Sequence, residues 1–129
     1  MNNKKTVLIV TDGSEKVTIM AESITRALKG KKVTIKTGSE FAGTDLLPAD
    51  FLFIGCDQPS PESFGYLDRM LQHINLAGRG CGVFSPESKK AALYLTKMLK
   101  SSEVSLKAEP LFAAESGEIP EWVSRITKG

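Results

Sequence analysis

The chain has 129 residues, of which 41% are hydrophobic and 25% charged, and its formal net charge is +2 at pH 7. This length predicts a single domain spanning residues 1–129, in which roughly two-thirds of the surface is buried. The small net charge and the scattered basic residues argue against a nucleic-acid partner. No apolar run approaches the roughly 18 residues of a membrane span, so no membrane partner is expected.

Strands and helices are expected to alternate along the chain, which predicts a parallel sheet with helices on both faces. The expected strands are Thr6–Val10, a segment around Val33 and Ile35, Phe51–Gly55, Cys81–Phe84 and Val104–Leu111. The last is predicted to be an edge strand, because Pro110 cannot donate to a ladder. Apolar residues at helical spacing predict helices within residues 17–28, ending at Gly30, and within 64–74, 91–99 and 119–126. Residues 38–48 predict a short helix or an irregular crossover.

The cysteines and the histidine form no recognisable ligand pattern. Cys56 and Cys81 belong to no CxxC motif, and His73 is the only histidine, so no metal site is expected. His73 is placed at the far end of its helix from Cys56, which favours a packed thiol over a nucleophile. The N-terminal apolar run is only four residues long, which predicts a strand and no signal peptide. The protein is therefore expected to be cytoplasmic with reduced thiols.

A four-residue phrase, Ser-Pro-Glu-Ser, occurs at Ser60–Ser63 and again at Ser85–Ser88. Each copy lies between a predicted strand and a predicted helix. Serine as the N-cap, proline at the first helical position and glutamate in the first turn are typical of a helix start. With the loop Thr11–Val17, the two copies place three strand-to-helix loops at one edge of the sheet, where doubly wound folds bind ligands.

The order of these elements, together with the phrases VLIV, DLLPADFLFIGC, FGYLDRMLQHINLAGRGCGVFS and KAEPLFA, resembles a flavodoxin-like domain over nearly the whole chain. The resemblance implies an α/β fold, a doubly wound three-layer sandwich with a five-stranded parallel sheet in the order 2-1-3-4-5. It also implies a site for flavin mononucleotide (FMN) and one- or two-electron transfer. An electron carrier or a binding module is therefore favoured over an enzyme, and a redox partner protein is expected.

The resemblance places the FMN phosphate in the first loop and the flavin ring between the two later loops. The candidate cofactor-binding residues are Thr11, Asp12, Gly13, Ser14, Glu15, Lys16 and Val17 in the first loop, Cys56, Asp57, Gln58 and Pro59 in the second, and Ser85, Pro86 and Glu87 in the third.

The first loop departs from the usual flavodoxin motif, Ser/Thr-x-Thr-Gly-x-Thr. When the following helix is aligned through Ala21, Asp12 and Ser14 fall on hydroxyl positions, Glu15 on the glycine and Val17 on the last threonine. A carboxylate near a phosphate and a missing hydroxyl donor both reduce affinity. This degenerate phosphate loop is therefore expected to bind phosphate weakly, with Lys16 offsetting part of the loss.

A cofactor-free interaction or regulatory module is the alternative function. The second and third loops carry no aromatic residue that could stack on a flavin ring, and Phe64 is expected to belong to the core. These features, with Glu15 and Val17 in the first loop, are what a flavodoxin-like chain that has lost FMN would show. Another phosphorylated ligand at the same loops stays open as well.

A response-regulator receiver shares this topology and is the third interpretation. Its acidic, hydroxyl and lysine positions would recruit Asp12, Asp57, Ser85 and Lys107. The fit is poor, because Gly55 or Cys56 occupies the position of the phosphoacceptor aspartate. The second acidic residue is absent, and Lys107 falls inside the fifth predicted strand.

Overall fold

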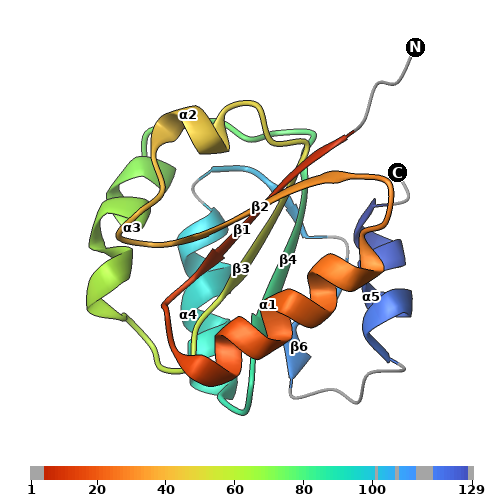
Figure 1. Ribbon diagram of the computed structural model, residues 1–129. Helices are drawn as coiled ribbons and strands as arrows, with labels where there is room; N and C mark the ends of the chain where they lie inside the picture. Colours follow the sequence, from red (N-terminus) through yellow and green to blue (C-terminus); the bar gives the residue numbers. More distant parts are fainter. Residues whose placement is uncertain (1–4, 101, 107, 113–117, 128–129) are drawn as a thin grey trace.

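The computed structural model describes residues 5–100, 102–106, 108–112 and 118–127 (Figure 1). The strands are β1 (Thr6–Thr11), β2 (Lys32–Thr37), β3 (Phe51–Gly55), β4 (Gly80–Ser85), β5 (Ser105–Leu106) and β6 (Leu111–Phe112). The helices are α1 (Glu15–Ala27), α2 (Gly43–Leu46), α3 (Gly65–Leu71), α4 (Lys89–Lys100) and α5 (Glu118–Thr127), with a 3₁₀ turn η1 (Glu62–Phe64) before α3.

The sheet is parallel throughout and runs in the order β2-β1-β3-β4-β5, which confirms the predicted order 2-1-3-4-5. Its central strands β1, β3 and β4 are almost entirely buried, as expected of parallel strands covered on both faces. At their carboxyl ends Thr11 pairs with Gly55, and Gly55 pairs with Phe84. The loops that follow these three strands therefore leave the sheet side by side.

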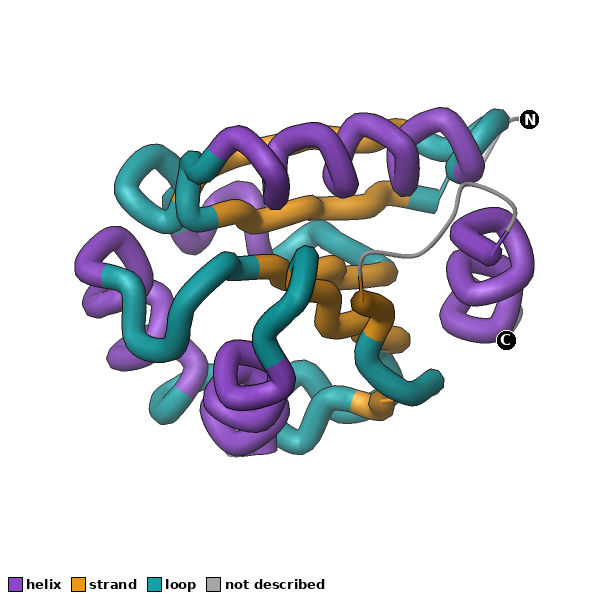
Figure 2. Tube along the Cα trace, turned by 90° about the horizontal axis from the view of Figure 1, so that it is seen from below, coloured by secondary structure: helices purple, strands orange, loops and turns teal. Residues whose placement is uncertain are grey.

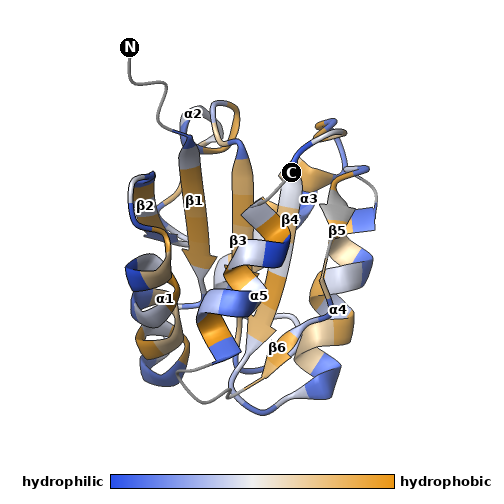
Figure 3. Ribbon diagram, turned by 90° about the vertical axis from the view of Figure 1, so that its right-hand side faces the viewer, coloured by the Kyte–Doolittle hydropathy of each residue, from blue (hydrophilic) through white to orange (hydrophobic). Residues whose placement is uncertain are grey.

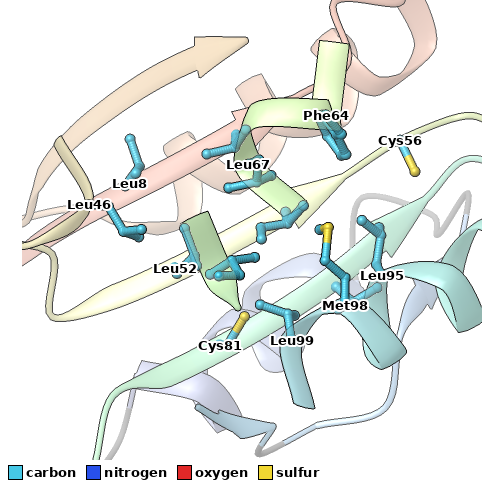
Figure 4. Close-up of a cluster of buried hydrophobic side chains, with 14 of the residues drawn as sticks. Leu8, Leu46, Leu52, Cys56, Phe64, Leu67, Cys81, Leu95, Met98 and Leu99 are labelled. Atoms are coloured by element: carbon cyan, nitrogen blue, oxygen red, sulfur yellow. The ribbon is translucent and has the colours of Figure 1, made fainter. Parts of the chain in front are cut away.

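Helices cover both faces of the sheet and make a three-layer α/β sandwich. Seen from below, α1 and α5 lie on one side of the strands and α3 and α4 on the other (Figure 2). Each side has its own apolar cluster, and the strands between them are the most hydrophobic part of the molecule (Figure 3). The cluster under α3 and α4 includes Cys56 and Phe64, which confirms the prediction that Phe64 is a core residue (Figure 4).

The fifth position of the sheet holds two short strands, so the prediction of one strand at Val104–Leu111 is wrong. β5 pairs with Gly80 and Cys81, and β6 pairs with Phe84 and Ser85. Between them Pro110 has no N–H to give to a ladder, and the carbonyl of Glu109 accepts a hydrogen bond from Trp122 Nε1 at 2.7 Å. The described residues between the two strands, 108–110, therefore belong to neither of them.

Several helix ends differ from the predicted ones. α1 ends at Ala27, and Gly30, at φ +82°, lies in the turn that follows. The predicted helix across residues 64–74 is the 3₁₀ turn η1 followed by the seven-residue α3. The short helix expected within residues 38–48 is α2, whose C-terminal carbonyls of Leu46 and Leu47 accept hydrogen bonds from Arg79 Nη1 at 3.2 and 2.7 Å. Among the described residues, no helix has the length and apolarity to cross a membrane.

Candidate functional site

The structure brings the three predicted loops together at the carboxyl edge of the sheet. The first connects β1 to α1, the second connects β3 to η1, and the third connects β4 to α4. All three lie at the lower edge of the sheet in Figure 1. This is the edge at which open α/β sheets bind ligands.

Asp12 is the centre of the contacts between the first two loops. Its Oδ1 accepts hydrogen bonds from the Ser14 backbone N–H at 2.9 Å and from the Ser14 hydroxyl at 2.7 Å. Its Oδ2 accepts a hydrogen bond from the backbone N–H of Asp57 at 2.8 Å. The carboxylate therefore points into the loops and joins two segments that are 45 residues apart in the chain.

The rest of the first loop is also held by hydrogen bonds within the loop. Thr11 is buried, and its Oγ1 accepts a hydrogen bond from the Gly13 N–H at 3.2 Å. Gly13 has φ +84°, a conformation that other residues adopt at a cost, so the turn requires glycine here. These bonds use the amide N–H groups of Gly13 and Ser14 within the loop.

The N-terminus of α1 keeps its first amides open. Ser14 is the N-cap residue, but its hydroxyl donates to Asp12 and makes no capping bond. Within the described part of the chain, the amides of Glu15, Lys16 and Val17 have no hydrogen-bond acceptor, as is usual for the first turn of a helix. They carry the positive end of the helix dipole at this edge.

The side chains of these three residues point in different directions. Glu15 is exposed, whereas Val17 is fully buried in the cluster under α1 and α5. Lys16 Nζ lies 3.2 Å from Glu87 Oε1 in the third loop, and these side chains are 64% and 71% exposed. An ion pair this exposed contributes little to stability, so Lys16 stays available to another anion.

The two Ser-Pro-Glu-Ser copies start their helices differently from the prediction. In the second copy Ser88, not Ser85, caps α4, since its Oγ accepts the Ala91 N–H at 3.0 Å. Ser85 is buried, and its Oγ accepts the Ser88 N–H at 3.3 Å. In the first copy Ser60 has φ +51° and Pro61 is the N-cap residue of η1. Both prolines therefore lie outside the helices, and the predicted caps at Ser60 and Ser85 are wrong.

Cys56 is a packed residue at the end of β3. Its side chain is completely buried and belongs to the cluster that contains Phe64 (Figure 4). Burial raises the pKa of the Cys56 thiol to about 12, and the negative charges of Asp12 and Asp57 act in the same direction. Such a thiol stays protonated at neutral pH, which opposes a nucleophilic role.

We expect Cys56 to be unreactive in the folded protein. The raised pKa reduces the thiolate fraction at neutral pH roughly a thousandfold relative to an ordinary thiol. Alkylation by iodoacetamide at pH 7.5 should therefore be at least about a hundredfold slower in buffer than in denaturant, as followed by mass spectrometry. Stability should also fall as the pH rises from about 9 towards 12, because the unfolded chain loses the thiol proton first. Alkylation at equal rates in both conditions would contradict this assignment.

The later loops hold no ring that could stack on a flavin. Residues 56–61 and 85–88 contain no aromatic side chain. Phe64 is fully buried, and Tyr94 lies within α4.

Of the residues that the receiver interpretation would use, Asp12, Asp57 and Ser85 lie at this edge, while Lys107 is outside the described residues.

Comparison with solved structures decides the fold. The flavodoxin of Streptococcus pneumoniae TIGR4 superposes with a TM-score of 0.82 at 15% identity, covering 95% of this chain and 97% of that one. Flavodoxin 2 of Bacillus cereus superposes with a TM-score of 0.80 at 17% identity, covering 96% and 98%. This chain has a flavodoxin-like fold. A flavodoxin of Fusobacterium nucleatum bound to FMN also matches, with a TM-score of 0.73, 15% identity and coverage of 96% and 98%. No family model and no curated protein matches the chain.

The Fusobacterium nucleatum flavodoxin is bound to FMN, so the donors at the loop edge of this chain are compared with what a phosphate group needs. The open amides of Glu15, Lys16 and Val17 are suitable donors for a phosphate. The donors of Ser14 and the amide of Asp57 are already bonded to Asp12. The backbone thus fits a phosphate, while one carboxylate of this chain competes for part of the donor set.

The sequence identified Asp12 as a residue that would repel phosphate but not as one that holds two loops together. The Asp-Gly-Ser phrase was the available signal, because an aspartate commonly accepts the N–H two residues later. The bond to Asp57 had no local signal, since it depends on β1 and β3 being neighbours. The pairing of Lys16 with Glu87 likewise depends on the tertiary fold.

Proposed function

We propose that this chain is an FMN-binding electron-transfer module with a weakened phosphate contact. The observation that carries the proposal is the open N-terminus of α1. It presents three amides that have no acceptor among the described residues, at the carboxyl edge of a flavodoxin-like sheet. The FMN-bound structural neighbour from Fusobacterium nucleatum supports the same ligand class.

The residues of the three loops would divide the work of binding. The amides of Glu15, Lys16 and Val17, with the Lys16 ammonium, would hold the phosphate. The loop Cys56–Pro59 and the loop Ser85–Glu87 would flank the flavin ring through backbone and aliphatic contacts. FMN would supply one- or two-electron transfer, and the protein would set its potential through these contacts. The exposed acids Glu62 and Glu87 would steer a redox partner with a basic surface.

A second candidate is a cofactor-free interaction module. The observation that favours it is the Asp12 carboxylate, which already accepts hydrogen bonds from both Ser14 donors and from the Asp57 amide. A phosphate that bound among these groups would meet a negative charge within a few ångströms. The two candidates differ in whether FMN binds at all.

Titration of the protein with FMN and, in parallel, with riboflavin tests the proposal. The two ligands differ only in the phosphate, so their affinity ratio isolates the contact with α1. We expect FMN to bind with a Kd on the order of 10 µM, which is about 7 kcal/mol. Riboflavin should bind about tenfold more weakly, because charged hydrogen bonds to the phosphate are only partly offset by Asp12. Quenching of flavin fluorescence measures both constants.

Either of two results would contradict the proposed FMN-binding electron-transfer function. A Kd for FMN weaker than about 1 mM, equivalent to about 4 kcal/mol, would favour the cofactor-free module. Equal affinities for FMN and riboflavin would show that the α1 amides hold no phosphate and would place any flavin binding elsewhere.

A further inference from the structure

Asp12 accepts hydrogen bonds from donors of a kind that can also bind an external anion. Its Oδ1 accepts hydrogen bonds from the backbone N–H and the hydroxyl of Ser14. Its Oδ2 accepts a hydrogen bond from the backbone N–H of Asp57 in the neighbouring loop. Backbone amides and hydroxyls at the start of a helix are the groups that bind phosphate and carboxylate oxygens in proteins. Here the anion is a side chain of the same polypeptide.

A phosphate could not share these donors with Asp12. Ser14 has one backbone N–H and one hydroxyl proton, and both are directed at Asp12 Oδ1, at 2.9 and 2.7 Å. An incoming anion would also be repelled by the carboxylate at this short range. Binding at full strength therefore requires the Asp12 side chain to swing out, which breaks the hydrogen bond to Asp57 as well.

We propose that Asp12 is a built-in competitor of the FMN phosphate, a tethered carboxylate that holds the Ser14 donors and fastens the first loop to the second. The part of this inference that concerns FMN rests on the proposed function. The part that concerns phosphate binding in general does not, and inorganic phosphate tests it separately. It makes one side chain, rather than the whole degenerate loop, the main cause of weak phosphate binding.

Asp57 offers a matched control for the charge. It lies at the same edge, and the group that it donates to Asp12 is its backbone N–H, not its side chain. Asp57→Ala removes one negative charge and leaves the donor, so the Asp12 hydrogen bonds survive. Asp12→Ala removes one negative charge and also frees the donors. A difference between the two variants therefore reports the hydrogen bonds and not the net charge.

The experiment measures FMN and riboflavin affinities of the wild type, Asp12→Ala and Asp57→Ala. We expect the ratio of riboflavin Kd to FMN Kd to rise at least tenfold in Asp12→Ala and less than threefold in Asp57→Ala. In a second measurement, inorganic phosphate is exchanged for chloride at constant ionic strength while thermal unfolding is followed. Phosphate should raise the Tm of Asp12→Ala and leave the wild type and Asp57→Ala unchanged.

The two measurements separate this inference from the proposed function. If no variant binds either flavin but phosphate stabilises only Asp12→Ala, the carrier function fails and the competitor role stands. If the wild type binds FMN and Asp12→Ala behaves like Asp57→Ala in both measurements, the carrier function stands and the competitor role is wrong. Should Asp12→Ala fail to fold, Asp12→Asn keeps the side-chain shape without the charge. In that variant the ratio of riboflavin Kd to FMN Kd and the Tm in phosphate must both rise relative to the wild type. No gain in that variant overturns the proposal.

Discussion

Gly55→Ala is expected to destabilise the protein by about 3 kcal/mol, the upper end of the usual cost of overpacking. Gly55 is the last residue of β3, between Thr11 of β1 and Phe84 of β4. A Cβ at this position would lie 2.5 Å from both Cδ2 and Cζ of Phe84, whose side chain is fully buried. A ring packed on all sides cannot move by the ångström or so that a methyl group needs, so the strands themselves must shift.

Urea denaturation followed by circular dichroism measures this effect, and two further variants give it a cause. Phe84→Leu makes room at the contact, so the double variant Gly55→Ala/Phe84→Leu should be clearly more stable than the sum of the single losses predicts. Gly65→Ala is the matched control. Its Cβ would meet only Arg69 Nη1, at 4.0 Å, and Gly65 is helical, so its stability should stay equal or rise by up to about 1 kcal/mol. Simple additivity in the double variant would disprove the contact with Phe84.

Much of the fold could be predicted because its strongest signals are local. The continuous apolar runs at residues 6–10 and 51–55 indicate central strands that are buried on both faces. The spacing of Val17, Met20, Ala21 and Ile24 indicates the buried side of α1, and all four are buried. Once strands and helices alternate, right-handed crossovers leave few arrangements of a parallel sheet.

The elements that the sequence did not predict depend partly on contacts between distant segments and partly on a choice between two similar local caps. The fifth strand is interrupted because the Glu109 carbonyl bonds to Trp122 instead of to a ladder. α4 starts after Ser88 because Ser85 is withdrawn into the protein at the end of β4. At Glu109 a hydrogen bond between separate segments decides the outcome. At Ser88 the deciding hydrogen bonds are local, three residues apart, and the sequence offered two serines of equal capping chemistry.

The candidate site shows the same division. The edge of the sheet followed from element order alone, and the structure places all three predicted loops there. The chemistry of the edge did not follow, because it depends on where one carboxylate points. An outward Asp12 would leave the Ser14 and Asp57 donors open beside a negative charge, whereas the inward Asp12 observed here accepts hydrogen bonds from those donors itself. Sequence alone cannot choose between these orientations, since the partner at Asp57 comes from another loop.

Trp122→Ala is expected to cost about 4 kcal/mol, the usual loss for deleting a large buried aromatic side chain. The indole is 6% exposed and lies over Gly82 of β4, where a Cβ would come within 2.9 Å of Trp122 Cη2. Its ring also makes an edge-to-face contact with Phe53, with centroids 5.5 Å apart. Trp122 therefore attaches α5 to the middle of the sheet, and the glycine in β4 is what lets it approach.

A second role of Trp122, the hydrogen bond from Nε1 to the Glu109 carbonyl, is separated by Trp122→Phe. This variant keeps an aromatic ring over Gly82 but removes the N–H donor. Because Glu109 is exposed and water can replace the donor, it should lose only about 1 kcal/mol, the usual net contribution of one hydrogen bond. Because the chain has a single tryptophan, unfolding of these variants must be followed by circular dichroism and not by tryptophan fluorescence. Equal losses in the two variants would mean that the hydrogen bond, and not the packing over Gly82, holds α5 on the sheet. A loss below about 1.5 kcal/mol for Trp122→Ala would mean that α5 is not part of the cooperative core.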